Sequence, residues 1–297
     1  MKNSILYSRL IKRNLRISLL IIISLLTIFH SCKKEELITP VIFNEEQNHL
    51  IMQFTAICND NCGVSNPLKL ENFVHNKNAF PMAVHIKENY YYDPLSNLNL
   101  FNTFKLSKYQ DTEAPSIYVG NDEKNSVTSL LKYKPEKALA ASIGKVELSN
   151  SKTYMSGTEV DAILINLNIT TKFSNSTEGN YFVNAYLIEN NIDGGETAGI
   201  YNQAGADEYK HNFVLRKSFT EEMNFPNISC SLRRERKTFG AVVPKTHISN
   251  NELFENNFQI TITPNYNIQN CHILIVVWEK ENTGLYKFIN VNRVGIY

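Results

Sequence analysis

The hydrophobic positions follow one pattern up to about residue 143 and another beyond it. In the stretch 47–143, compact apolar runs are separated by polar segments in which apolar residues return every three or four positions. A compact run is typical of a buried strand, and the wider spacing is typical of an amphipathic helix. The pattern predicts strands at 50–54, 80–86 and 116–119 and helices at 65–74 and 95–104. Strands that alternate with helices favour an α/β layer arrangement.

From residue 144 onward the apolar positions have a period of two, which is typical of half-buried strands. The alternation is clearest at 163–170 and 258–263. The run 273–278 is apolar throughout, as expected of a strand buried on both faces, and the turn at 281–284 makes it the first strand of a hairpin. Strands at this spacing, with few helix signals, predict a β-sandwich over residues 144–297.

The N-terminus has the order of a secretory signal. Residues 1–31 carry five cations and no acidic residue, and an uninterrupted apolar run of 13 residues spans Ile17–Phe29. A membrane-spanning helix needs about 20 residues, so this run is too short to cross a bilayer. Ser31-Cys32 follows it, in the place where lipoprotein signals are cut. We expect cleavage before Cys32 and lipid, including a palmitate-type acyl chain, on that cysteine; the alternative is an uncleaved signal anchor.

Residues 32–46 are short and polar enough to be a tether between the lipid and the first folded domain. The tether begins with Lys33-Lys34-Glu35-Glu36. A charged stretch directly after the lipidated cysteine resembles the export signal of surface lipoproteins in Bacteroidota, and it is equally consistent with an ordinary solvated linker. One lipidated cysteine carries two or three acyl chains, which makes anchoring stable.

Composition narrows the class of partner. Apolar residues are 43% of the chain and aromatic residues 11%, which is enough for folded cores. The formal net charge is +1, and loss of the five signal cations leaves the mature chain at −4. Nucleic-acid binding requires concentrated positive charge, so we expect no nucleic-acid partner. The sequence holds no zinc-protease, P-loop, dinucleotide or nucleophile-elbow motif, and we expect neither metal nor cofactor.

An ordered series of short motifs resembles a Bacteroidota outer membrane protein family related to a twenty-eight-kilodalton antigen. The motifs are Phe54-Thr55, the pair Cys58/Cys62, Ala83-Val84-His85, Ala114-Pro115, the strand Tyr186–Ile192 and the stretch Tyr209–Arg216. The resemblance implies a thioredoxin-like α/β domain over 47–143 and an immunoglobulin-like sandwich over 144–297, an α+β protein in all. It also implies a place in the outer membrane, and it makes Pro115 a candidate for the cis-proline that faces the cysteine pair.

The cysteine pair is the one enzyme-like feature. Thiol–disulfide oxidoreductases use Cys-x-x-Cys at a helix start, where the first thiolate is stabilised and the second thiol can reach it. Here three residues separate Cys58 from Cys62, and Asp60 between them opposes a thiolate. We weigh a structural or vestigial pair against a redox-active one and favour the former. The other two cysteines, Cys230 and Cys271, form either a disulfide within the strand-rich half or two buried thiols.

The sequence therefore predicts a lipid-anchored envelope protein that is held on the membrane through Cys32 and is exposed at the cell surface. We expect it to bind an unknown protein, peptide or glycan without catalysis. One alternative is a membrane-tethered thiol–disulfide oxidoreductase in which Cys58 is the nucleophile and Cys62 resolves the mixed disulfide. Another is a structural accessory subunit of a larger envelope assembly. A tyrosine cluster, Tyr90-Tyr91-Tyr92, is a candidate binding patch or ordinary loop packing.

Overall fold

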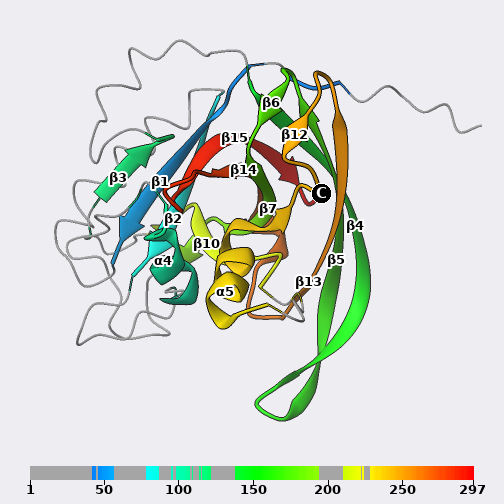
Figure 1. The fold of residues 1–297 in the computed structure, drawn as a ribbon. Helices are drawn as coiled ribbons and strands as arrows, with labels where there is room; N and C mark the ends of the chain where they lie inside the picture. The colour runs from blue at the N-terminus through cyan, green and yellow to red at the C-terminus, as the bar shows by residue number, and fades with distance from the viewer. Residues whose placement is uncertain are drawn as a thin grey trace, which may run out of the picture. The chain divides into compact units, whose positions relative to one another are not determined.

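Two β-sheets and two helices make up most of the part of the chain that the structure describes (Figure 1). The structure is a computed structural model, and it describes residues 42–44, 46–56, 78–86, 95, 98–107, 109, 114, 116–121, 138–193, 210–221, 223 and 228–297. Residues Phe43–Tyr297 form one compact unit.

The larger sheet has eight strands and mixes sequence-distant segments. Its order is β15 (Tyr286–Gly295), β14 (Cys271–Lys280), β7 (Asn180–Glu189), β10 (Val214–Ser218), β2 (Ala79–His85), β1 (His49–Thr55) and β3 (Ser116–Val119), and the short β11 (Ala241–Val242) also pairs with β7. β1 runs parallel to β2, and β10 runs parallel to β2 on its other edge. The remaining neighbours are antiparallel.

The smaller sheet has three long strands in the order β13 (Leu253–Ile262), β5 (Thr158–Phe173) and β4 (Ala140–Met155). Two short ladders join β6 (Thr177–Glu178) to β12 (His247–Ile248) and β8 (Ile192–Asp193) to β9 (Lys210–His211). The described helices are α4 (Leu98–Phe104) and α5 (Cys230–Phe239), with a short 3-10 turn, η1, at Ile268–Asn270.

The two sheets face each other across one apolar core. Alternate residues of β5, among them Ile165 and Leu167, point at alternate residues of the larger sheet such as Val183, Leu187 and Ile275. All five side chains are almost completely buried. In the smaller sheet, alternation along β5 and β13 separates this buried face from a polar outer face.

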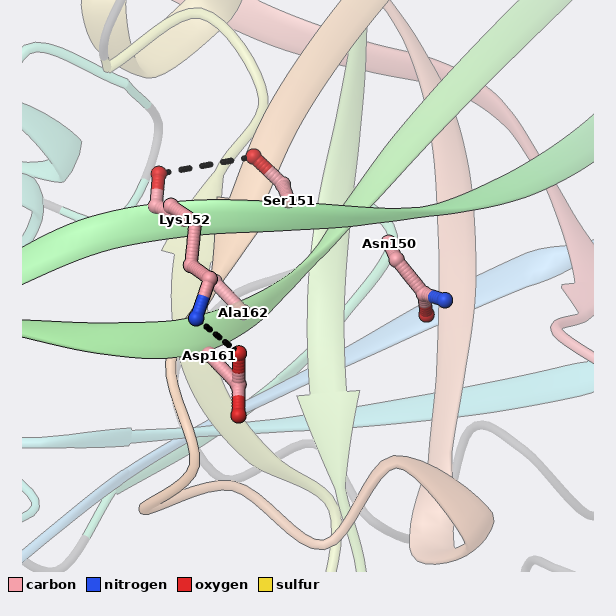
Figure 2. A pocket seen from close by; sticks show the side chains of 5 residues that line it. All are labelled: Asn150, Ser151, Lys152, Asp161 and Ala162. Carbon is pink, nitrogen blue, oxygen red and sulfur yellow. Dashed lines mark hydrogen bonds and ion pairs between the residues drawn. The ribbon is translucent and has the colours of Figure 1, made fainter.

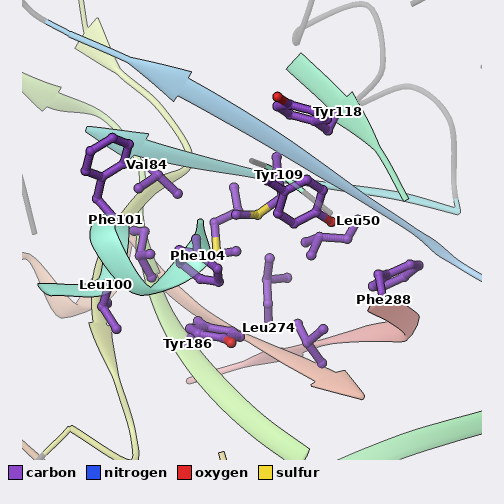
Figure 3. Packing of buried hydrophobic residues seen from close by; sticks show 14 of the residues in the cluster. Leu50, Val84, Leu100, Phe101, Phe104, Tyr109, Tyr118, Tyr186, Leu274 and Phe288 are labelled. Carbon is purple, nitrogen blue, oxygen red and sulfur yellow. The ribbon is translucent and has the colours of Figure 1, made fainter. Parts of the chain in front are cut away.

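A second core covers the other face of the larger sheet, under the two helices (Figure 3). Phe104 of α4 and Phe239 of α5 pack on Trp278 with ring centroids 6.2 and 5.3 Å away. The indole N–H of Trp278 donates to the hydroxyl oxygen of Tyr186 at 3.0 Å, and that hydroxyl donates to the carbonyl of Thr238 at 2.5 Å. β7 and β14 are therefore buried on both faces, which is why their sequences are apolar almost throughout.

Much of the element-level prediction is confirmed. The apolar runs at 50–54, 80–86 and 116–119 are β1, β2 and β3, and the helix expected at 95–104 contains α4. The alternating segments are β5 and β13, and the C-terminal hairpin is β14 and β15 with Gly284 in its turn. The helix expected at 65–74 lies outside the described residues.

The predicted fold class is wrong. A thioredoxin-like α/β domain would carry its own sheet, but β1, β2 and β3 belong to the same sheet as β7, β10, β14 and β15. The expected boundary at 143–144 falls inside β4. The physical reason lies in β2, which is buried along its length and therefore needs a neighbour on the edge that β1 does not occupy. β10, more than 120 residues later in the sequence, pairs with that edge. The two facing sheets pack like a sandwich, but this sandwich is not a separate immunoglobulin-like domain, because its larger sheet also contains β1, β2 and β3.

Candidate binding groove

A long β-hairpin projects from the smaller sheet, and we call its outer part, Ser151–Ala162, the arm (Figure 1). β4 and β5 pair over sixteen residues each, from Ala140 with Phe173 to Met155 with Thr158. Ser156 and Gly157 join them, with φ of 50° and 83°. Two consecutive positive φ angles are those of the tight hairpin turn whose twist matches paired strands, and glycine adopts them without strain.

The third strand does not follow the arm. β13 pairs with β5 over ten residues and ends where Ile262 meets Ile163. Pro264 comes two residues later and has no N–H to donate to a ladder. The chain turns away there, because the N–H of Tyr266 donates to the carbonyl of Thr263 at 3.2 Å. Five residues of β5, Thr158–Ala162, are thus left with β4 on one side and no strand of the described chain on the other.

The core-facing side of the smaller sheet continues along the arm. Opposite residues of an antiparallel pair share a face, and Asn150 lies opposite Ile163 as Lys152 lies opposite Asp161. Ile163 and Asp161 follow the same alternation as the buried Ile165. Along the arm this face is polar and exposed, because it carries Lys152 and Asp161 in place of the buried apolar side chains nearer the body.

Two adjoining hollows form a groove on this face. One, of about 590 Å³, is lined by Asn150 and by the arm residues Ser151, Lys152, Asp161 and Ala162 (Figure 2). The other, of about 250 Å³, shares three of these residues and extends to the turn after β13. Its further lining is Ile163, Ile262, Thr263, Pro264, Tyr266 and Ile268. The groove therefore has a polar floor on the arm and an apolar wall on the body.

The floor of the groove carries a small surplus of negative charge. The ammonium of Lys152 lies 2.5 Å from a carboxylate oxygen of Asp161 and 3.9 Å from one of Glu159. These side chains are more than half exposed, so the ion pairs contribute little to stability. One cation facing two carboxylates leaves the site able to attract a further positive charge.

The wall of the groove is held by a buried charge pair. The guanidinium of Arg216 lies 4.7 Å above the ring of Tyr266, and its Nε is 3.0 Å from a carboxylate oxygen of Glu189. The other oxygen of Glu189 accepts the N–H of Asn267 at 2.8 Å. Burial raises the pKa of the Glu189 carboxyl. The N–H of Asn267 and the charge of Arg216 act in the opposite direction and only partly offset that rise. The stack fixes Tyr266, so this wall is preformed.

Another hollow, of about 460 Å³, lies over the opposite face of the smaller sheet and is rich in amides. The side-chain N–H of Gln259 donates to the amide oxygen of Asn166 at 2.8 Å there, and Asn168 and Asn257 flank the pair. This surface offers hydrogen bonds, but the aromatic residue in its lining, Phe258, is buried in the core between the sheets and has no exposed face for a sugar ring. The groove is therefore the stronger candidate.

Most of the predicted site residues lie outside the described residues: Cys32, Cys58, Cys62, Pro115 and Tyr90–Tyr92. The other two cysteines are free thiols, so the structure does not contain the bridge considered for them. Cys230 is exposed at the start of α5, and Cys271 is buried at the start of β14. Burial, with the nearby Glu189 carboxylate, raises the pKa of the Cys271 thiol to about 12.

Two buried histidines meet near the end of β2. The rings of His85 and His211 are edge to face with centroids 5.2 Å apart. Across the residues that the structure describes, no group of three or more His, Cys, Asp or Glu side chains is placed to hold a metal ion. His85 is the last residue of β2, and its ring packs against that of His211.

The groove is not among the features predicted from the sequence, although the sequence does contain a pattern that indicates the arm. Ser156-Gly157 stands between two long segments of alternating residues, which is the pattern of a two-residue hairpin. That signal predicts the arm. It does not predict the groove, because the groove depends on where β13 stops relative to β5.

Comparisons with known proteins support the fold. No protein-family model matches the chain, and no curated protein matches it. Among solved structures it is similar to HBP35 of Porphyromonas gingivalis, with a TM-score of 0.57 and 16% identity over 85% of this chain and 76% of that one. A structural genomics target, SoR45, matches 52% of this chain and 86% of that one at 11% identity, with a TM-score of 0.20.

Porphyromonas gingivalis belongs to the Bacteroidota, the group that the sequence resemblance pointed to, although the antigen family itself is not shown. At 16% identity the likeness extends to the fold alone. No helix within the described ranges is long and apolar enough to cross a membrane.

Proposed function

We propose that this protein is a lipid-anchored protein of the bacterial cell envelope that binds another protein through the groove beside the arm. The observation that carries the binding role is the groove itself: the polar face of the arm, left open beyond the end of β13, next to a preformed apolar wall. Large apolar surfaces exposed beside polar rims are typical of interaction sites.

The anchor is tested by replacing Cys32 with Ser and fractionating cells. We expect the variant to lose incorporation of labelled fatty acid and to leave the membrane fraction. A variant that stays in the membrane and takes up label as before would rule out lipid at Cys32.

The binding role is tested by photocrosslinking on intact cells. A benzophenone amino acid at Asn150 lies in the groove, and the same group at Lys245, on the loop before β12, is exposed away from the groove and is the matched control. We expect a discrete crosslinked product from position 150 and none of the same mass from position 245. Identical products from both positions, or none from either, would contradict a binding role for the groove.

A further inference from the structure

We propose that the free edge of β5 at Thr158–Ala162 binds an extended, basic segment of a partner protein, which adds as a strand in line with β13. This inference rests on the proposed function and names the partner's chemistry. It starts from the five residues that β5 extends beyond the last pair with β13, Ile262 with Ile163.

An added strand has both room and hydrogen-bonding groups at this edge. At a rise of about 3.3 Å per residue, five residues offer about 17 Å of strand edge. Within Thr158–Ala162, alternate residues point their N–H and C=O groups to the same edge of β5 that pairs with β13 from Ile163 onward. Unpaired groups of this kind are the template for strand addition by an extended peptide. Because Thr263 and Pro264 lead β13 away, the position next to this edge is open within the described chain.

The groove face selects the side chains of the added strand. Alternate side chains of an incoming strand point into the groove. Those near the base meet Ile163, Tyr266 and Ile268, which favours apolar residues there. Those farther out meet the carboxylates of Glu159 and Asp161, which Lys152 balances only in part. The complementary segment is therefore basic toward the arm tip and apolar toward the body.

A second copy of this chain fits the edge poorly. A two-fold antiparallel pairing centred on Val160 places Glu159 of each copy opposite Asp161 of the other. Moving the centre by one residue places a carboxylate opposite its own counterpart. Like charges directly opposite across two strands are destabilising. The acidic pair thus disfavours self-association, the usual hazard of a free edge, while it attracts a basic partner.

The probe is a fluorescein-labelled peptide of alternating Lys and Val, about ten residues long. Its controls are an alternating Glu and Val peptide, and the Lys and Val peptide with alternate backbone nitrogens methylated so that one edge cannot donate. Fluorescence anisotropy with the lipid-free chain 33–297 measures binding. We expect the Lys and Val peptide to bind about tenfold or more tightly than either control.

Charge reversal tests the site. The double variant Glu159→Lys/Asp161→Lys should lose about tenfold in affinity for the Lys and Val peptide and gain as much for the Glu and Val peptide. Glu255→Lys, on the opposite face of the same sheet, is the matched control and should change neither affinity. The milder Glu159→Gln should weaken binding of the Lys and Val peptide in the same direction, in case the double variant disturbs the arm.

Two results would overturn the inference. One is binding that methylation of the peptide backbone leaves unchanged, since strand addition requires those N–H groups. The other is equal loss of affinity in the Glu255→Lys control, which would mean that the peptide senses only overall charge. A failure here, together with a crosslinked partner at Asn150, would leave the groove as a binding site and exclude strand addition by a basic segment.

Discussion

At the scale of single residues, His272 gives the structure a testable pH dependence. It lies on β14, where burial, with the charge of Arg293, lowers the pKa of its imidazole from 6.5 to about 4. The unfolded chain therefore binds a proton between those two values that the folded chain does not. The contribution of this neutral histidine to stability is complete above pH 6.5 and is lost as the pH falls toward 4.

We expect this histidine to account for a loss on the order of 2 kcal/mol in the free energy of unfolding between pH 6.5 and 4, after allowance for its partly exposed ring. Denaturant unfolding of the chain and of His272→Gln at several pH values measures it, because the neutral amide does not titrate. If both proteins lose stability in parallel over this window, the burial of a neutral His272 is incorrect.

The cysteines show what a sequence can and cannot predict about residues. An even number of cysteines in an exported chain permits a disulfide, and so Cys230 and Cys271 are reasonable partners on paper. Pairing depends on distance in space, and here one thiol is exposed on a helix while the other is buried beside Glu189. Local sequence contains no information on that separation.

At the scale of elements, two glycines with positive φ allow the contributions of the arm and of the core to stability to be compared. Gly240 ends α5 at φ 107°, and a Cβ there would lie 2.1 Å from the carbonyl oxygen of Val183. Gly157, at the arm tip, has nothing within 4 Å of its Cβ position. We expect Gly240→Ala to destabilise the protein by about 3 kcal/mol or more, through overlap with the backbone and left-handed strain.

Gly157→Ala should cost about 1 kcal/mol or less, because only the left-handed strain remains and the arm can open locally. Chemical denaturation compares the two variants with the parent chain. A larger loss from Gly157→Ala than from Gly240→Ala would show that the arm, and not the layer under α5, holds the fold together.

Individual strands were predictable because each one carries its own pattern. Alternation fixes the two faces of β5 and β13, and the unbroken apolar run 273–278 identifies β14 as a strand buried on both sides. The unequal lengths of β5 and β13 could not be predicted in this way. The free edge arises from the register between two strands about ninety residues apart, which no local pattern contains.

At the scale of the whole molecule, one sheet joins the two halves of the chain. The link is the parallel pair of β2 with β10, at Ala83 and Val214. It explains why the expected division into a thioredoxin-like domain and a sandwich is wrong: periodicity identifies strands but does not say which sheet they join. The resemblance to a two-domain family led to the same error.

We therefore expect residues 33–297 to unfold in one cooperative transition. Strands from both sides of residue 143 share one sheet and the core under the two helices, so neither half can lose its packing alone. Differential scanning calorimetry gives the test, with the calorimetric enthalpy equal to the van't Hoff enthalpy. Two resolved transitions would instead indicate independent domains.

Whether the open edge of β5 binds an extended chain is tested most directly by amide hydrogen exchange, followed by mass spectrometry, with and without the Lys and Val peptide. We predict that the peptide slows exchange about tenfold at those amides of 158–162 that point to the open edge, and leaves the amides of β7 and β14 unchanged. Exchange at these edge amides that is already slow without peptide, or that the bound peptide does not slow, would contradict the claim.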